Sequence, residues 1–183
     1  MSLPPSRVCA SRSSRLVFVS EPTEFPVIDA AKYRQVLGHF PTGVTVITAM
    51  TADGPAGMAI GSFSSLSLDP AQVLFCPGKT SGSWAKLKSV DTFCVNILAE
   101  DQEDVCRIFA SRSEDKFAEI GWKRSANGSP LINGALAYID CTTFGILEGG
   151  DHDIVVGSVT DLEVMHEGAP LIFFRGGYGR VTF

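Results

Sequence analysis

The chain has 183 residues, of which 45% are hydrophobic and 19% are charged, and its formal net charge is -5 at pH 7. This balance predicts one globular domain with a sizeable core and excludes a disordered chain. No apolar run approaches the ~20 residues that a membrane-spanning helix needs. Because Arg7, Arg12 and Arg15 precede the first acidic residue, Glu21, the net charge of residues 21–183 is -8, which argues against a nucleic-acid surface.

The cysteine pattern predicts a reducing compartment. The five cysteines are odd in number and form no CxxC motif, and two of them, Cys94 and Cys141, lie inside expected strands. A thiol in such a place behaves as a small hydrophobe, so we expect unpaired cysteines and a cytoplasmic protein. No cluster of His, Cys and carboxylate residues has metal-ligand spacing, so no metal site is expected.

Residues 1–25 are rich in Ser, Arg and Pro and are expected to form an N-terminal extension to a single domain over residues 26–183. Asp29 is placed to cap a first helix, which Pro41 ends. The apolar residues of this helix share one face: Tyr33, Val36, Leu37 and Phe40. Two later helices are expected after the capping residues Ser81 and Asp101.

Most of the remaining chain is typical of strands. Residues 44–48 are β-branched throughout, and a turn at residues 52–55 leads into a return strand at residues 58–60, which predicts a hairpin. Further strands are expected over residues 73–76, 92–98, 135–147, 152–165, 171–174 and 178–183. The alternation in residues 155–162 predicts a strand with one wet face. Many strands with only short helices between them favour an antiparallel barrel over a doubly wound sheet.

The segment from Ala56 to Trp84 contains the strongest indication of a ligand. Its first serines offer a polar rim to a flat, hydrogen-bonding ligand: they are Ser62, Ser64, Ser65 and Ser67. Lys79 and Ser81 then precede a helix, where backbone N–H groups, hydroxyls and a lysine favour phosphate. Together these features predict a nucleotide cofactor, although serines in an edge strand and a serine cap are also ordinary structural features.

Seven motifs follow one another between residue 30 and residue 183. They are FPTGVTVIT at 40–48, SFSSLSLDP at 62–70, SGSW at 81–84, FCVNIL at 93–98, DKF at 115–117, GDHDIVVG at 150–157 and PLIFFRGGY at 170–178. In this order they resemble the short-chain flavin reductases, which are the reductase components of two-component flavin-dependent monooxygenases. The resemblance covers nearly all of the chain except the N-terminal extension. It implies a mainly β, antiparallel, Greek-key-like, FMN-binding split β-barrel with short helices.

The resemblance also implies an activity and a set of site residues. A homodimer would bind flavin in a groove near the subunit interface, reduce FMN or FAD with NADH or NADPH, and pass the reduced flavin to a partner monooxygenase. The implied cofactor-binding residues are Ile60, Gly61, Ser62, Ser64, Ser65 and Ser67 for the flavin ring and ribityl chain, Lys79, Ser81, Ser83 and Trp84 for the phosphate, and Phe117 and Tyr178 near the two rings. Where family members often carry Thr and then Asn or Thr, this chain has Ala59 and Gly61, so main-chain groups must supply those contacts.

His152 is the candidate catalytic residue. A lone histidine in a Gly-Asp-His-Asp turn is more often a hydrogen-bonded turn residue, but its position in the family motif implies that it orients the nicotinamide or supplies a proton near the flavin. For Asp151 and Asp153 we expect a solvated turn and a strand start. Trp84 either stacks on an aromatic ring or, because of its helical spacing with Leu87, belongs to the core.

Two alternatives remain at this point. One is a flavoprotein oxidase that keeps its FMN and acts on a substrate of its own. The other is a flavin-binding module without catalytic activity. The serines and His152 favour the reductase, because a storage site needs no open face for a nicotinamide.

Overall fold

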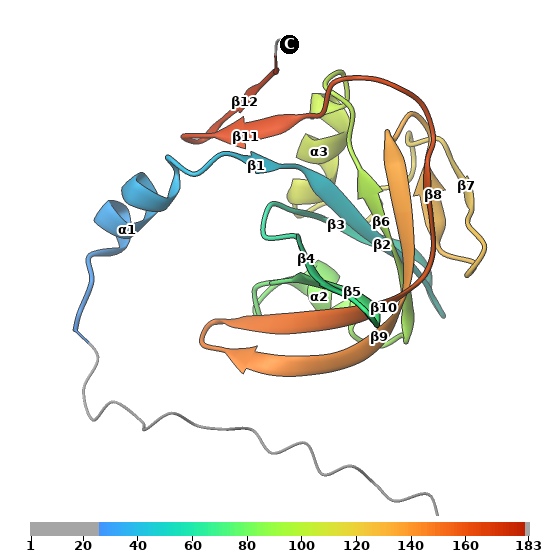
Figure 1. The fold of residues 1–183 in the computed structure, drawn as a ribbon, viewed down its shortest axis with the longest axis horizontal. Coiled ribbons are helices and arrows are strands. Elements are labelled where there is room, and N and C mark those ends of the chain that lie inside the picture. The colour runs from blue at the N-terminus through green and yellow to red at the C-terminus, as the bar shows by residue number, and fades with distance from the viewer. Residues whose placement is uncertain (1–25, 182–183) are drawn as a thin grey trace, which may run out of the picture.

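Twelve strands and three helices make up residues 26–181, the part of the chain that the computed structural model describes (Figure 1). The helices are α1 (Ala30–Leu37), α2 (Gly82–Leu87) and α3 (Glu103–Ala110). The strands are β1 (Thr42–Gly43), β2 (Thr45–Thr51), β3 (Gly54–Ile60), β4 (Ser64–Leu68), β5 (Ala71–Phe75), β6 (Thr92–Ile97), β7 (Trp122–Arg124), β8 (Pro130–Ile132), β9 (Ala137–Gly149), β10 (His152–Val164), β11 (Ile172–Phe174) and β12 (Gly177–Gly179). The expected N-terminal extension lies outside the described residues.

Seven of the strands form one antiparallel sheet in the order β3-β2-β6-β9-β10-β5-β4. The long β9–β10 hairpin curves around one side of the molecule (Figure 1). β3 and β4 follow each other in the chain but occupy opposite ends of this order, so the barrel is split between them. Non-consecutive strands lie side by side at β2–β6 and β5–β10, as expected of a Greek-key-like arrangement. The predicted antiparallel split barrel is therefore confirmed.

β2 is buried on both faces because α2 packs on one side of it and α3 on the other. Successive side chains of a strand point to opposite faces. Val44, just before β2, and Val46 pack in one apolar cluster with Phe109 of α3, whereas Ile47 packs in a second cluster with Trp84 of α2. α2 and α3 therefore lie on opposite sides of the β2–β3 hairpin.

The predicted start of the third helix is wrong. Asp101 does not cap α3, because the helix begins one residue later, after Gln102, and has no side-chain cap. Gln102 is buried, and its side chain instead accepts a hydrogen bond from the Ala99 N–H at 3.0 Å and donates to the Asn133 carbonyl at 2.9 Å. The side-chain amide thus ties two loops together, which a capping pattern in the sequence does not reveal.

The prediction that the strand over residues 155–162 has one wet face is also wrong for β10. Its residues 153–157 are buried or partly buried on both faces, whereas residues 160–164 are exposed on both faces. Two irregularities in the β9–β10 register, at Val156/Gly157 and between Val159 and Asp161, also change which face each side chain occupies. Burial is therefore graded along the strand instead of alternating across it.

Asp29 caps α1 as predicted, and its Oδ1 accepts a hydrogen bond from the Lys32 N–H at 2.7 Å. The expected apolar face of this helix is nevertheless uncovered. Tyr33, Val36 and Leu37 are each at least half exposed, and no residue of α1 is buried among the described residues. α1 stands apart from the barrel (Figure 1).

Candidate functional site

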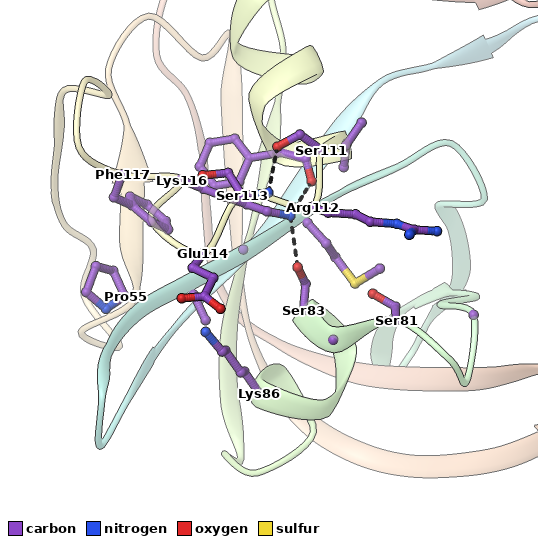
Figure 2. A pocket seen from close by; sticks show the side chains of 18 of the residues that line it. Pro55, Ser81, Ser83, Lys86, Ser111, Arg112, Ser113, Glu114, Lys116 and Phe117 are labelled. Atoms are coloured by element: carbon purple, nitrogen blue, oxygen red, sulfur yellow. Dashed lines mark hydrogen bonds between the residues drawn. The ribbon is translucent and has the colours of Figure 1, made fainter.

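A cavity of about 810 Å³ opens across the edge strand β3 (Figure 2). Three segments line it: residues 55–59 of β3, residues between 78 and 86 at the start of α2, and residues 109–117 after α3. Its size lies in the range of cofactor and small-molecule sites. Because the three segments are distant in sequence, the fold alone brings them together.

Gly57 allows the β3 wall to be formed by bare main chain. A Cβ atom at this position would lie 2.6 Å from Cε1 of Phe109, so any larger residue would displace the ring. Phe109 is itself buried and packs edge-to-face on Phe117, with ring centroids 5.0 Å apart. This stack holds the segment that follows α3 against the cavity.

Lys116 supplies a buried positive charge to the cavity. Its Nζ donates hydrogen bonds to Ser83 Oγ at 2.9 Å and to the Phe109 carbonyl at 2.8 Å (Figure 2). Within residues 26–181 it forms no ion pair. Burial, and secondarily the nearby Lys86, lower the pKa of Lys116 from its ordinary value. A desolvated cation without a carboxylate partner is a favourable place for an anionic ligand.

The other charged side chains around the cavity strengthen this bias. Lys86 and Arg112 also line it, and Glu114 is the one carboxylate among the described residues that do so (Figure 2). Three cations against one anion create a positive potential, which is focused by the low-dielectric walls. The cavity is therefore suited to a ligand that carries phosphate.

α2 begins as predicted and contributes hydroxyls to the cavity. Ser81 caps the helix by accepting a hydrogen bond from the Trp84 N–H at 3.3 Å, and both Ser81 and Ser83 line the cavity. Phe117 lines it as well. Of the four predicted phosphate-side residues, Ser81 and Ser83 are the two that line this cavity.

Lys79 and Trp84 lie elsewhere. Lys79 directs its ammonium group to Glu148 at the end of β9 and does not line the cavity. Trp84 is only 4% exposed and packs edge-to-face on Phe75, so its ring is a core residue that cannot stack on a ligand. Of the two alternatives for this ring, the structure therefore favours the core, and a contact of the Trp84 main chain with the phosphate stays a prediction.

The serine-rich segment forms the β3–β4 connection and the edge strand β4, outside the cavity described above. Ser62 is exposed, but its hydroxyl donates to the Cys76 carbonyl at 3.0 Å and accepts from the Cys76 N–H at 3.1 Å. Ile60 belongs to the core and is 6% exposed, and its carbonyl accepts a hydrogen bond from Thr45 Oγ1 at 3.0 Å. Gly61, Ser64 and Ser65 are exposed, and Ser67 is partly buried.

His152 lies at the margin of the cavity, beside Gly78. An added Cβ on Gly78, which lines the cavity, would be 3.7 Å from His152 Nε2. His152 Nδ1 lies 2.8 Å from Asp151 Oδ1, which fixes the orientation of the half-exposed ring. Asp151 is exposed, as expected of a turn.

Tyr178 is not among the residues that line the cavity. Its hydroxyl lies 3.2 Å from Cys106 Sγ of α3, and its ring packs at the edge of the second apolar cluster. Burial and the contact with Cys106 raise the pKa of Tyr178 to about 12, so the phenol is neutral at physiological pH. Any contact with nicotinamide would have to be made at the partly exposed edge of the ring.

The sequence interpretation missed several residues that shape the cavity: Gly57, Phe109, Arg112 and Lys116. Lys116 was noted only as part of the DKF motif. The available signal was a lysine between an acidic residue and a phenylalanine, which by itself gives no direction to the side chain.

Comparisons with known proteins agree with this geometry. Residues 37–182 match the family model of the flavin reductase-like domain. A flavin reductase of Pseudomonas putida is 50% identical over 153 residues, which cover 83% of this chain and 90% of that protein. HsaB, the reductase subunit of a flavin-dependent monooxygenase from Rhodococcus jostii, is 50% identical over 151 residues, or 82% of this chain and 77% of that protein.

A solved structure of a flavin reductase is also similar to this chain. The NADH:FAD oxidoreductase SgcE6 of Streptomyces globisporus, in complex with NAD and FAD fragments, is 38% identical and has a TM-score of 0.80, covering 84% of this chain and 93% of that chain. The split barrel thus places the chain in the class of flavin reductases. The chain belongs to the flavin reductase-like family, and its predicted assignment as an NAD(P)H-dependent flavin reductase is confirmed.

Proposed function

We propose that this enzyme transfers a hydride from NADH or NADPH to FMN or FAD and supplies the reduced flavin to a separate flavin-dependent monooxygenase. The observation that carries the proposal is Lys116, a buried cation that faces a nucleotide-sized cavity without a carboxylate partner. HsaB is named as the reductase subunit of such a monooxygenase, which supports the same role for this chain.

The residues present fit a flavin phosphate. A phosphate oxygen accepting from Lys116 would supply the negative charge that its surroundings lack, and Ser83 and Ser81 add hydroxyl donors beside it. Arg112 at the rim offers a second cation that suits the additional phosphate of FAD. Lys116, and not Lys79, is the lysine proposed to bind the phosphate, because the charge of Lys79 is paired with Glu148.

The flavin ring is proposed to lie toward the opening between β3 and β4. Gly61, Ser62, Ser64 and Ser65 are exposed residues there, and Ser67 lies two residues further along β4. When bound, the flavin supplies the redox chemistry by accepting a hydride from the reduced nicotinamide. The protein binds and orients both rings and offers main-chain N–H groups to the negative charge that arrives.

Anaerobic stopped-flow mixing of the enzyme with each nicotinamide and each flavin tests the proposal. We expect loss of nicotinamide absorbance that requires added flavin, continues over many turnovers, and releases reduced flavin to an added monooxygenase. A tightly held flavin that copurifies, with no turnover of added flavin, would indicate a flavoprotein oxidase instead. No oxidation of NADH or NADPH with either flavin would contradict the proposal.

His152→Ala is expected to lower kcat/KM for the nicotinamide by about tenfold or more, with a smaller change in flavin affinity. The reason is its place beside Gly78, which lines the cavity. Steady-state rates at saturating flavin measure the effect. His166→Ala is the control, because His166 contacts the Gly134 carbonyl in a distant loop. Equal kinetics for the His152 variant and wild type would contradict this role.

We further propose a homodimer in which the apolar face of α1 is covered by the second copy. Val36 and Leu37 are 59% and 50% exposed, and Phe174 of the neighbouring small sheet is 42% exposed. Exposed apolar patches of this kind mark interaction sites. The chain is expected to sediment at twice the mass of one chain, and Val36→Ser/Leu37→Ser is expected to sediment as a monomer. A wild-type monomer at micromolar concentration would contradict the proposal.

The cytoplasm is the proposed location. Cys76, Cys94, Cys106 and Cys141 are all unpaired thiols, which suits a reducing compartment. None of the helices found in residues 26–181 has the length and apolar character needed to traverse a bilayer.

A further inference from the structure

A buried carboxylate at the start of β10 connects the sheet to α2. The Asp153 side chain is 4% exposed, and its Oδ2 accepts hydrogen bonds from Trp84 Nε1 at 2.8 Å and from Lys88 Nζ at 2.9 Å. The main-chain N–H of Asp153 also donates to the Pro77 carbonyl at 3.0 Å. Asp153 was expected to be only a strand start, but it makes three contacts with the segment that forms one wall of the cavity.

The two side-chain donors come from the same side of α2. Trp84 and Lys88 are four residues apart, so they are neighbours on one face of the helix. Lys88 Nζ also lies 5.8 Å from the centre of the Trp84 ring. These donors hold the pKa of the Asp153 carboxyl below its ordinary value, so it is ionised at neutral pH. A buried, ionised carboxylate with two such donors fixes the rotation and position of a short helix.

A different part of the α2 segment lines the cavity. Ser81, Ser83 and Lys86 line it, and the hydroxyl of Ser83 accepts a hydrogen bond from Lys116 Nζ. Within residues 26–181 that hydroxyl is the one side-chain group that accepts a hydrogen bond from Lys116. A rotation or shift of α2 would therefore move Ser83 away from the cation.

We propose that Asp153 is a positioning residue for the phosphate-binding part of the cavity. It ties α2 to β10 so that Ser83 and Lys116 converge on one anion. The inference rests on the proposed function only in naming that anion as a flavin phosphate. Asp153 itself does not line the cavity, so it acts through α2.

Asp153→Asn in the full chain is the test, because the amide oxygen can still accept from Trp84 while the charge that pairs with Lys88 is lost. We expect KM for FMN to rise about tenfold and kcat to change less than about twofold, since misplaced binding groups weaken binding of ground state and transition state together. Main-chain amides of residues 82–88 are expected to exchange hydrogen about tenfold faster than in wild type.

Asp161→Asn is the matched control. Asp161 lies on the same strand, and its carboxylate accepts a hydrogen bond from Tyr138 Oη at 2.7 Å, far from α2. Lys88→Met removes the ion pair from the other side at a half-exposed position and is expected to change KM for FMN in the same direction. It provides the measurement if the Asp153 variant does not fold.

An unchanged KM for FMN in both the Asp153 and the Lys88 variants, even with faster exchange in α2, would overturn the inference by making Asp153 a purely structural residue. Unchanged exchange would overturn it as well, and this readout needs no substrate. Absence of turnover by the wild-type enzyme would instead contradict the proposed function, so the two failures are distinguishable.

Discussion

Replacing Lys116 with methionine is expected to weaken the binding of FMN by about a hundredfold while leaving the protein folded. Loss of one partner of a buried, hydrogen-bonded charge pair costs about 2–5 kcal/mol, and ~2.7 kcal/mol corresponds to a hundredfold change in Kd. Lys116 is 7% exposed, so it would meet the flavin phosphate as a largely desolvated cation. Methionine retains most of the volume of the lysine stem, so the packing against Phe109 is preserved.

Equilibrium titration of FMN, followed by quenching of its fluorescence, measures the effect. Riboflavin, which has no phosphate, serves as the second ligand and is expected to bind wild type and variant with similar affinity. Lys123→Met is the control protein, since Lys123 is an exposed residue of β7. If Lys116→Met weakened FMN and riboflavin equally, Lys116 would not bind the phosphate.

The pH dependence of FMN binding provides a signature of the same residue. Burial lowers the pKa of Lys116, so in the absence of ligand its charge is lost at a lower pH than that of an ordinary lysine. Kd for FMN is therefore expected to rise with pH in the range just below 10.5, and the Lys116→Met variant should lack this rise.

The same shift in pKa has the opposite effect on the stability of the fold: FMN binding weakens as pH rises, whereas the contribution of Lys116 to stability becomes more favourable. Because the folded-state pKa of Lys116 lies below its unfolded value, the folded chain binds fewer protons there, so this group makes the protein more stable as pH rises through that range. Loss of the charge in Lys116→Met thus removes a desolvated cation from the apo protein, although it also removes a donor from the Phe109 carbonyl. We expect these effects to offset each other to within about 1 kcal/mol.

The fold was largely predictable because local signals decide it. The β-branched residues 44–48 and the turn after them form the β2–β3 hairpin, and the turn near Gly150, which has a φ of 76°, joins the two long strands. Asp29 and Ser81 cap helices as their side chains predict. Each of these features depends on a few neighbouring residues, so the sequence pattern contains the necessary information.

The candidate site was less predictable because long-range contacts decide it. Lys116 meets Ser83 across 33 residues of chain, and no local pattern specifies that contact. Lys79 was expected near phosphate from its place before α2, yet a glutamate 69 residues away, Glu148, binds its charge. Trp84 faces the core for a similar reason, since Asp153 in β10 accepts its indole N–H.

Asn96→Ala is expected to destabilise the protein by about 3 kcal/mol, because it leaves the buried Ile132 N–H without its acceptor, at a cost of about 1–3 kcal/mol. It also removes an amide donor from the Val46 and Pro130 carbonyls, although the Pro130 carbonyl still accepts from Thr48 Oγ1. Asn96 in β6 is fully buried. Its Nδ2 donates to the Val46 carbonyl at 3.2 Å, to Thr48 Oγ1 at 3.0 Å and to the Pro130 carbonyl at 3.4 Å, and its Oδ1 accepts from the Ile132 N–H at 2.8 Å.

This amide is one connection between the main sheet and the β7–β8 hairpin, beside the hydrogen bond from Thr48 Oγ1 to the Pro130 carbonyl. β8 contributes Ile132 to the apolar cluster that also contains Phe109 and Phe117, the two rings that hold Lys116 in place. Urea unfolding is expected to show a lower midpoint for Asn96→Ala with an unchanged m-value. Asn133→Ala, at an exposed position, should unfold like wild type. A loss of unfolding free energy below about 1 kcal/mol would contradict the prediction. An ordered water or a rearranged hairpin would then satisfy the former partners of Asn96, and its polar contacts would not be what fixes β8 beside the cavity.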